Sequence, residues 1–95
     1  MTDVTVTRED GPNGGRYVVS HDGAVAEMTY SRAGKTRIII DHTGVPDAMR
    51  GLGIGKRLVE AAVTDARAEG FKIIPLCPFA KAALQKEPAW QDVVQ

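Results

Sequence analysis

Three consecutive isoleucines, a glycine-rich turn and an amphipathic segment follow one another in this 95-residue chain and strongly restrict its fold. The isoleucines lie in residues 36–42 and are typical of a central strand that is covered on both faces. Residues 53–69 carry apolar side chains at helical spacing and end at Gly70, a residue type that often caps helices. Residues 72–77 are again apolar and predict a strand. This order of strand, helix and strand predicts a right-handed crossover with two parallel strands.

The chain before the isoleucine run consists of short alternating segments separated by turns. The first segment begins at Val4, and the glycine-rich residues 11–15 follow it. Asp22 and Gly23 are typical of a tight hairpin, after which residues 24–30 alternate between the two faces of a strand. This pattern predicts an antiparallel meander.

The C-terminal part predicts one further helix. Pro78 suits the first helical position and Pro88 ends the pattern, so we expect a short helix over residues 78–87. The predicted fold is one α/β (α+β) domain over residues 1–95, with a mainly antiparallel sheet, a parallel β-α-β crossover and a short C-terminal helix. A chain of this length suits a single hydrophobic core.

Charge and composition disfavour several classes of partner, including nucleic acid bound through Arg50, Lys56 and Arg57. Twelve basic and twelve acidic residues cancel, so no overall field favours nucleic acid or an anionic membrane surface. The apolar runs are far shorter than the roughly 20 residues that span a bilayer. Residues 1–4 lack the basic start of a signal peptide, and the single Cys77 has no partner for a disulfide, so we expect a cytoplasmic protein. The two histidines and the cysteine are too widely separated for a metal site.

Residues 50–57 read Arg-Gly-Leu-Gly-Ile-Gly-Lys-Arg, which is the composition of a phosphate-binding turn. Gly51, Gly53 and Gly55 can adopt positive φ and allow backbone N–H groups to approach an anion, and the helix start adds unpaired donors. Neither the Gly-x-Gly-x-x-Gly motif of dinucleotide-binding folds nor the Gly-Lys-Ser/Thr motif of nucleotide P-loops fits. From the residues alone, a phosphate site and an ordinary structural turn both stay open.

The turn resembles the acyl-CoA signature of the GNAT superfamily of N-acetyltransferases, written Arg/Gln-x-x-Gly-x-Gly/Ala at the head of a helix. Arg50, Gly53 and Gly55 match it residue for residue. A His-Thr pair before the loop and the Leu-Cys-Pro-Phe segment at residues 76–79 are similar to a short, single-domain branch of that superfamily. The resemblance covers roughly residues 16–94. It implies a minimal domain without the pair of helices that full-length members carry between their first two strands.

The resemblance implies that acetyl-CoA is the acyl donor and that an amine of a small molecule or a protein is the acceptor. Backbone amides of the turn would hold the diphosphate of coenzyme A, and the pantetheine arm would pair with the chain near Val45. The implied cofactor-binding residues are Val45, Arg50, Gly51, Leu52, Gly53, Ile54, Gly55, Lys56, Cys77, Phe79 and Lys81. The expected activity is direct transfer of the acetyl group by a monomer or a weak dimer.

His42 and Cys77 are the candidate catalytic residues. His42 is expected at the ligand edge, where an imidazole can take the proton of an amine near neutral pH; a histidine that is only hydrogen-bonded at a strand end is the alternative. Glu27 and Asp41 are weaker candidates for the base. Cys77 precedes a helix start, which favours a thiolate. An acetyl-cysteine relay, redox pairing with coenzyme A and packing beside the cofactor all fit this position.

Three residues depart from the family pattern. Gly44 stands where the short branch tends to carry a glutamate, and Ala83 stands where it often has a tyrosine. Gln85 lies near the expected position of the tyrosine that serves as general acid in many larger relatives. These departures favour a second hypothesis, a non-catalytic acyl-CoA-binding module.

Overall fold

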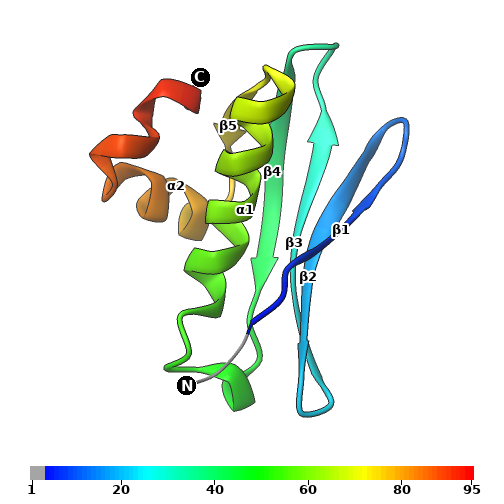
Figure 1. Ribbon diagram of the computed structural model, residues 1–95, viewed down its shortest axis with the longest axis vertical. Helices are drawn as coiled ribbons and strands as arrows, with labels where there is room; N and C mark the ends of the chain where they lie inside the picture. The colour runs from blue at the N-terminus through cyan, green and yellow to red at the C-terminus, as the bar shows by residue number, and fades with distance from the viewer. Residues whose placement is uncertain (1–3) are drawn as a thin grey trace.

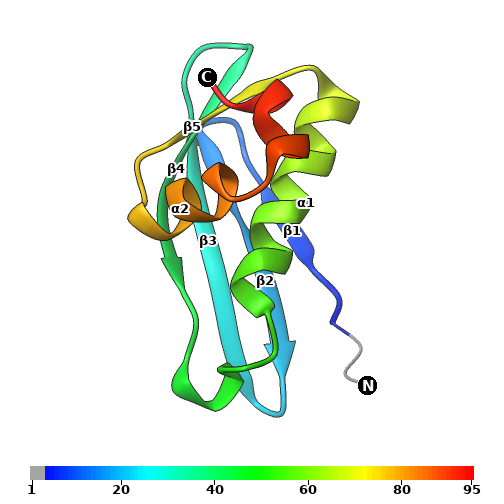
Figure 2. The same ribbon diagram turned by 90° about the vertical axis from the view of Figure 1, so that its left-hand side faces the viewer.

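A five-stranded sheet with helices packed on one of its faces forms the structure, a computed structural model that describes residues 4–95. The strands follow chain order across the sheet: β1 (Thr7–Asp10), β2 (Gly14–His21), β3 (Ala24–Arg32), β4 (Arg37–Gly44) and β5 (Lys72–Pro75). The helices are α1 (Ile54–Glu69) and α2 (Pro78–Gln85), with 3-10 turns η1 (Asp47–Met49) and η2 (Pro88–Val93). Figures 1 and 2 show α1, α2 and η2 on the same side of the sheet. Residues 1–3 lie outside the described residues. They are part of the segment whose lack of a basic start led us to expect a cytoplasmic protein.

The predicted meander and crossover are confirmed. Strands β1 to β4 pair antiparallel, and β4 pairs parallel with β5 after the chain has passed through α1. The predicted hairpin connects β2 and β3, with Asp22 at φ 49° and Gly23 at φ 80°. The predicted start of the first strand at Val4 is wrong, because β1 begins at Thr7. Val4 and Val6 pack against the core instead of extending the edge of the sheet.

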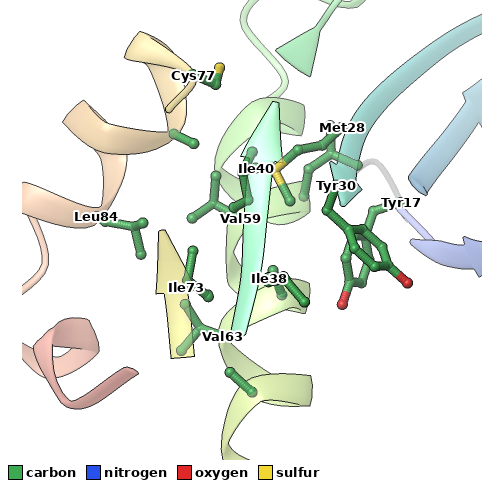
Figure 3. Close-up of a cluster of buried hydrophobic side chains, with 14 of the residues drawn as sticks. Tyr17, Met28, Tyr30, Ile38, Ile40, Val59, Val63, Ile73, Cys77 and Leu84 are labelled. Atoms are coloured by element: carbon green, nitrogen blue, oxygen red, sulfur yellow. The ribbon is translucent and has the colours of Figure 1, made fainter. Parts of the chain in front are cut away.

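The hydrophobic core lies between the sheet and α1. Ile38 and Ile40 from β4 and Ile73 from β5 meet Val59 and Val63 from α1, and each of these five side chains is at most 1% exposed (Figure 3). Full burial of one such side chain contributes about 1.5–3 kcal/mol of transfer free energy. This packing fixes the position of α1, and therefore of the turn at its start, against the end of β4.

Strand β4 is covered on one face only, which corrects the expectation of cover on both faces. Ile38 and Ile40 are buried, whereas Ile39 points to the opposite face and is half-buried. That open face carries polar side chains, and Arg16 Nη1 lies 3.3 Å from Glu27 Oε2 across it. A sheet made mainly of antiparallel strands can leave such a face to water.

Both ends of α1 are set by glycines in the left-handed region. Gly53 is the N-cap at φ 70° and Gly70 is the C-cap at φ 78°, in agreement with the predicted helix over residues 53–69. Helix α2 begins at Pro78 as predicted, but it ends at Gln85, two residues earlier than expected. The chain then forms η2, whose buried Trp90 packs against the core.

A polar contact joins the sheet to the outer part of α1. The Tyr17 hydroxyl donates a hydrogen bond to Asp65 Oδ2 at 2.8 Å. Burial raises the pKa of Tyr17 above its ordinary value of 10, and the hydrogen bond to Asp65 adds to the shift. The guanidinium of Arg8 lies 5.7 Å from the Tyr17 ring centroid and closes this end of the core.

Candidate functional site

The parallel strands β4 and β5 separate at their carboxyl ends and form a fork. They pair as far as Ile40 and Pro75, and then β4 continues to Gly44 against β3. The backbone N–H groups of Leu76 and Cys77 both donate to the Ile40 carbonyl, at 3.2 and 3.0 Å, as the chain turns away from β4. Figure 2 shows α2 beginning beside the C-terminal half of β4. Ligands of sheets with parallel strands favour this kind of edge.

A bulge in β4 lies directly at the fork. Tyr30 of β3 pairs with Ile40, but the preceding Thr29 pairs with His42, so Asp41 is one extra residue in β4. Such an insertion shifts the alternation of side chains by one position. The faces of the residues that follow the bulge are therefore the reverse of those that plain alternation predicts.

The reversal decides which side chains enter the fork from the helix side. Thr43 lies opposite the buried Met28 and points to the helix side, because directly paired residues share a face. His42 lies on the open face and is exposed. Plain alternation from the buried Ile40 gives the opposite arrangement.

A cleft of about 460 Å³ opens on the helix side of the fork. It is lined by Thr43, Val45, Met49, Arg50, Gly51, Gly53, Ile54, Gly55, Lys56 and Phe79. All of these except Thr43 and Met49 are residues that the family resemblance implied for the cofactor. Sequence reasoning missed Thr43 because no glycine or proline marks the bulge. It missed Met49 because this residue lies in η1, which was expected to be loop.

The other predicted site residues lie outside the cleft lining. Leu52 is half-buried against the core, and Lys81 borders a separate hollow beside α2. His42 is on the open face together with Asp41, whose carboxylate accepts a hydrogen bond from Ser31 at 2.9 Å.

Two of the departures from the family pattern are not in the cleft lining, although the hollow that Ala83 borders shares Lys56 and Phe79 with the cleft. Ala83 borders the outer hollow formed with Lys86, and Gln85 borders the hollow near the C-terminal tail. Gly44 lies close to His42, because a Cβ built on Gly44 would be 3.3 Å from His42 Nε2. Neither Ala83 nor Gln85 has a side-chain hydroxyl, so neither supplies one to the cleft.

The structure explains why glycine stands at each of three positions in the turn. Gly51 and Gly53 have φ of 83° and 70°, and a Cβ built on either residue meets no atom within 4 Å. Their backbone conformation disfavours other residues, while the space beside them is open. Gly55 differs, because its Cβ would lie 2.8 Å from Cε2 of Phe79, whose ring covers it. The turn thus presents bare backbone to the cleft at two positions and to an aromatic ring at the third.

The start of α1 leaves several backbone donors without partners inside the helix. The Arg57 N–H donates to the Gly53 carbonyl at 3.2 Å, so the N–H groups of Ile54, Gly55 and Lys56 precede the helical ladder. No side chain caps this end, and the first turn contains no acidic residue. The positive end of the helix dipole is therefore uncompensated, which suits an anionic ligand.

Two cations beside these donors make ion pairs near the protein surface, and Lys56 Nζ also lies 6.0 Å from the centroid of the Trp90 ring. Arg50 Nε lies 2.8 Å from Asp47 Oδ1, and Lys56 Nζ lies 3.0 Å from Glu87 Oε1. The Arg50 and Lys56 side chains are 78% and 61% exposed. Exposed pairs of this kind contribute little free energy, so both cations can turn toward an anion in the cleft at small cost.

Cys77 is the N-cap of α2 (Figure 3), and its side chain contacts Thr43. Its sulfur is 3.4 Å from Thr43 Oγ1, and the residue is 5% exposed. Burial opposes ionisation of the thiol, but the hydrogen bond between Cys77 and Thr43 and those from the backbone N–H groups of Ala80 and Phe79 outweigh it. Together they hold the pKa of Cys77 below its ordinary value of 9.

Residues 4–95 contain neither a cluster of metal-ligating side chains nor a helix suited to crossing a membrane. No group of three or more histidine, cysteine, aspartate or glutamate side chains is placed to share a metal ion in this part of the chain. None of the helices described there has the length and apolar character that crossing a membrane requires.

Comparison with known proteins places this architecture among acetyltransferase-like chains. A family model described as GCN5-related N-acetyl-transferase matches residues 16–93. Protein NATD1 of Xenopus tropicalis is 37% identical over 68 residues, which cover 72% of this chain and 61% of that protein. Protein NATD1 of Homo sapiens is also 37% identical over 68 residues and is covered over 58% of its length. The chain thus spans about three fifths of the length of these curated relatives.

A solved structure with the same arrangement is a GCN5-like protein from Staphylococcus aureus, determined in solution by NMR. It is 42% identical to this chain and superimposes with a TM-score of 0.74. The match covers 94% of this chain and 87% of the other. Sequence and fold therefore agree over nearly the whole length.

Proposed function

The chain belongs to the GCN5-related N-acetyltransferase family, and we propose that it moves an acetyl group from acetyl-CoA to an amine by direct transfer. The observation that carries the proposal is the uncapped start of α1. There the free N–H groups of Ile54, Gly55 and Lys56 and the open backbone of Gly51 and Gly53 border one cleft at the fork. An anionic ligand that also needs an extended channel fits this combination.

Coenzyme A has the chemistry that these residues can hold. Its diphosphate would receive hydrogen bonds from the N–H groups at the start of α1 and the charges of Arg50 and Lys56. Val45 and Phe79 provide the apolar walls on the two sides of the cleft. Acetyl-CoA would supply an activated thioester, and the role of the chain is to bind it, align it and exclude competing orientations.

The amine acceptor is proposed to approach from the open face of the sheet. His42 and Asp41 are exposed there at the fork, on the opposite side from the cleft. His42 would take a proton from the attacking amine, which must be neutral to react. No helix covers this face within residues 4–95, which suits either a small amine or an amine on a protein.

A non-catalytic acyl-CoA-binding module is the second candidate. The observation in its favour is that Ala83 and Gln85 bring no hydroxyl group to the cleft and His42 lies outside it. Such a module would keep the phosphate-binding turn and bind the same ligand without turnover.

A pair of measurements separates these candidates. Acetyl-CoA should raise the melting temperature of the protein, whereas ATP and NAD at equal concentration should not. Release of free thiol should then depend on the presence of an amine from a panel of small amines and lysine peptides. Stabilisation without amine-dependent thiol release supports the binding module, and the absence of stabilisation by acetyl-CoA refutes both.

The free Cys77 and the open face of the sheet bear on where the protein is located and on whether it forms oligomers. Cys77 is a free thiol, which suits the reducing cytoplasm. The described part of the open face mixes polar side chains, such as the paired Arg16 and Glu27, with the exposed Val25, and single apolar side chains of this kind do not require a permanent partner. We therefore propose a cytoplasmic protein that is a monomer or a weak dimer.

A further inference from the structure

Thr43 is the only residue with a side-chain hydroxyl among the described residues that line the cleft. The other members of the lining are apolar, are glycines, or are the cations Arg50 and Lys56. A hydroxyl can accept one proton while it gives another, which a guanidinium cannot do. Thr43 is therefore the lining residue suited to pass a proton into the cleft.

Thr43 lies at the end of the cleft opposite the start of α1. Arg50, Gly53 and Lys56 border the cleft at the start of α1, where an anion is favoured. Thr43 borders it from β4, just beyond the bulge where β4 and β5 separate. If the diphosphate occupies the first end, as the proposed function requires, the acyl end of the ligand reaches the second.

Cys77 lies behind Thr43 as a source of protons. Its sulfur is 3.4 Å from Thr43 Oγ1, in a direction that allows the thiol to donate to the hydroxyl oxygen. A thiolate formed there would keep the backbone N–H groups of Phe79 and Ala80 as donors at the start of α2. With the thiol as donor, the hydroxyl proton of Thr43 is free to point into the cleft.

We propose that Thr43 gives a proton to the sulfur that leaves the acetyl group, and that Cys77 replaces the proton on Thr43. The amine nitrogen forms a bond to the acetyl carbon with its lone pair, and the electron pair of the C–S bond moves to sulfur. Thr43 Oγ1 gives its proton to that sulfur and takes the proton of Cys77 Sγ. The amine loses its surplus proton on the open face, to His42 or water, and Cys77 recovers one from solvent, so charge balances over one turnover.

This inference rests on the proposed function, and it assigns different roles to the two residues. Thr43 contacts the reacting atoms and is a catalytic residue. Cys77 acts through Thr43 and is a positioning residue that also restores its proton. No covalent bond forms between Cys77 and the acetyl group, which distinguishes this role from an acetyl-cysteine relay.

The decisive variants are Thr43→Val, which keeps the shape but removes the hydroxyl, and Thr43→Ser, which keeps the hydroxyl. Thr43→Val should bind acetyl-CoA within a factor of about two of wild type, because the phosphate end is untouched. Its kcat should fall by about a hundredfold, the usual scale of proton donation, while Thr43→Ser stays within about tenfold of wild type. The mechanism is overturned if Thr43→Val keeps the wild-type kcat.

A readout without turnover tests the pair itself. The rate at which iodoacetamide alkylates Cys77, followed against pH without ligand, reports the pKa of the thiol. That pKa should rise in Thr43→Val and return toward the wild-type value in Thr43→Ser. An unchanged pKa in Thr43→Val contradicts the Thr43–Cys77 hydrogen bond on which the proton supply depends.

The role of Cys77 has its own test. Cys77→Ser keeps a hydrogen-bonding group but not an acidic one, so the pH profile of kcat should lose the change that coincides with the measured pKa of the thiol. An unaltered profile removes Cys77 from the proton path. Wild-type protein that binds acetyl-CoA but releases no thiol with any amine refutes the proposed transfer itself; wild-type turnover with an undiminished Thr43→Val variant refutes only the proton path.

Discussion

A negative charge placed at Gly53 should disrupt acetyl-CoA binding far more than it disrupts the fold. Gly53 has φ of 70°, and a Cβ built on it meets no atom within 4 Å. Gly53→Glu and Gly53→Gln therefore both fit without a clash, and both carry the cost of a left-handed residue, about 1–2 kcal/mol. This strain is common to the two variants, so their difference isolates the charge.

The size of the charge effect can be worked from the position of the turn. If the diphosphate lies on the N–H groups that follow Gly53, the carboxylate introduced by Gly53→Glu comes within about 6 Å of it. Two phosphate charges repelled at this distance with an effective dielectric constant of about 40 cost nearly 3 kcal/mol. The dissociation constant of Gly53→Glu should thus be about a hundredfold higher than that of Gly53→Gln.

Isothermal titration of both variants with acetyl-CoA measures this difference, and urea unfolding supplies the stability control. Equal stability and a large gap in affinity are expected, with the gap narrowing as salt is raised, because the charges are exposed to solvent. Equal affinity of the glutamate and glutamine variants at low salt would refute the assignment of the diphosphate to this turn.

Three other perturbations test separate parts of the structure. His42→Ala should lower kcat and leave the affinity for acetyl-CoA unchanged, because His42 is outside the cleft; an unchanged kcat removes it from catalysis. The raised pKa of Tyr17 makes the wild type lose stability as pH rises above about 10, where the unfolded phenol ionises first. The free energy of unfolding of Tyr17→Phe, measured with urea, should fall less between pH 8 and 11 than that of the wild type. An equal fall in both proteins would contradict a contribution from the Tyr17 hydroxyl. Leu84→Ala, at a side chain 1% exposed, should cost about 2–5 kcal/mol of unfolding free energy, and a cost below about 1 kcal/mol on the same scale would contradict the packing of α2.

Local signals in the sequence were sufficient for most of the fold. The left-handed Gly53 and Gly70 mark the ends of α1, and the apolar residues between them recur at helical spacing. The Asp22-Gly23 pair defines the first hairpin. Given these elements, the parallel pairing of β4 with β5 follows from the handedness and length of the crossover.

The side chains at the fork could not be placed from local signals. The extra residue Asp41 is defined by the register between two strands, and neither glycine nor proline accompanies it. This bulge exchanges the faces of His42 and Thr43, so alternation from Ile40 misplaces both. Whether a strand face is covered also depends on distant parts of the chain. Ile39 is an isoleucine like its two neighbours, but no helix packs on its side of the sheet in the described part of the chain.

The turn itself was predictable because its composition, its position before a helix and the family pattern all pointed to the same residues. Gly51 and Gly53 do have positive φ. Gly55 is required for a different reason, because the Phe79 ring packs against it. Phe79 lies far along the chain, so the residues near Gly55 in the sequence do not indicate this contact. The residues whose backbone is open to the cleft and the residue that Phe79 covers are therefore distinguished only in three dimensions.

Amide chemical shifts recorded by two-dimensional NMR during a titration with acetyl-CoA test the central claim most directly. The account predicts saturable shifts that are largest for the N–H groups of Ile54, Gly55 and Lys56 and that extend to Thr43 at the fork. A second hollow, lined by residues that include Arg8, Tyr17 and Asp65, lies between the sheet and α1. Binding that instead perturbs the amides of that hollow, and leaves those at the start of α1 unmoved, would contradict this prediction.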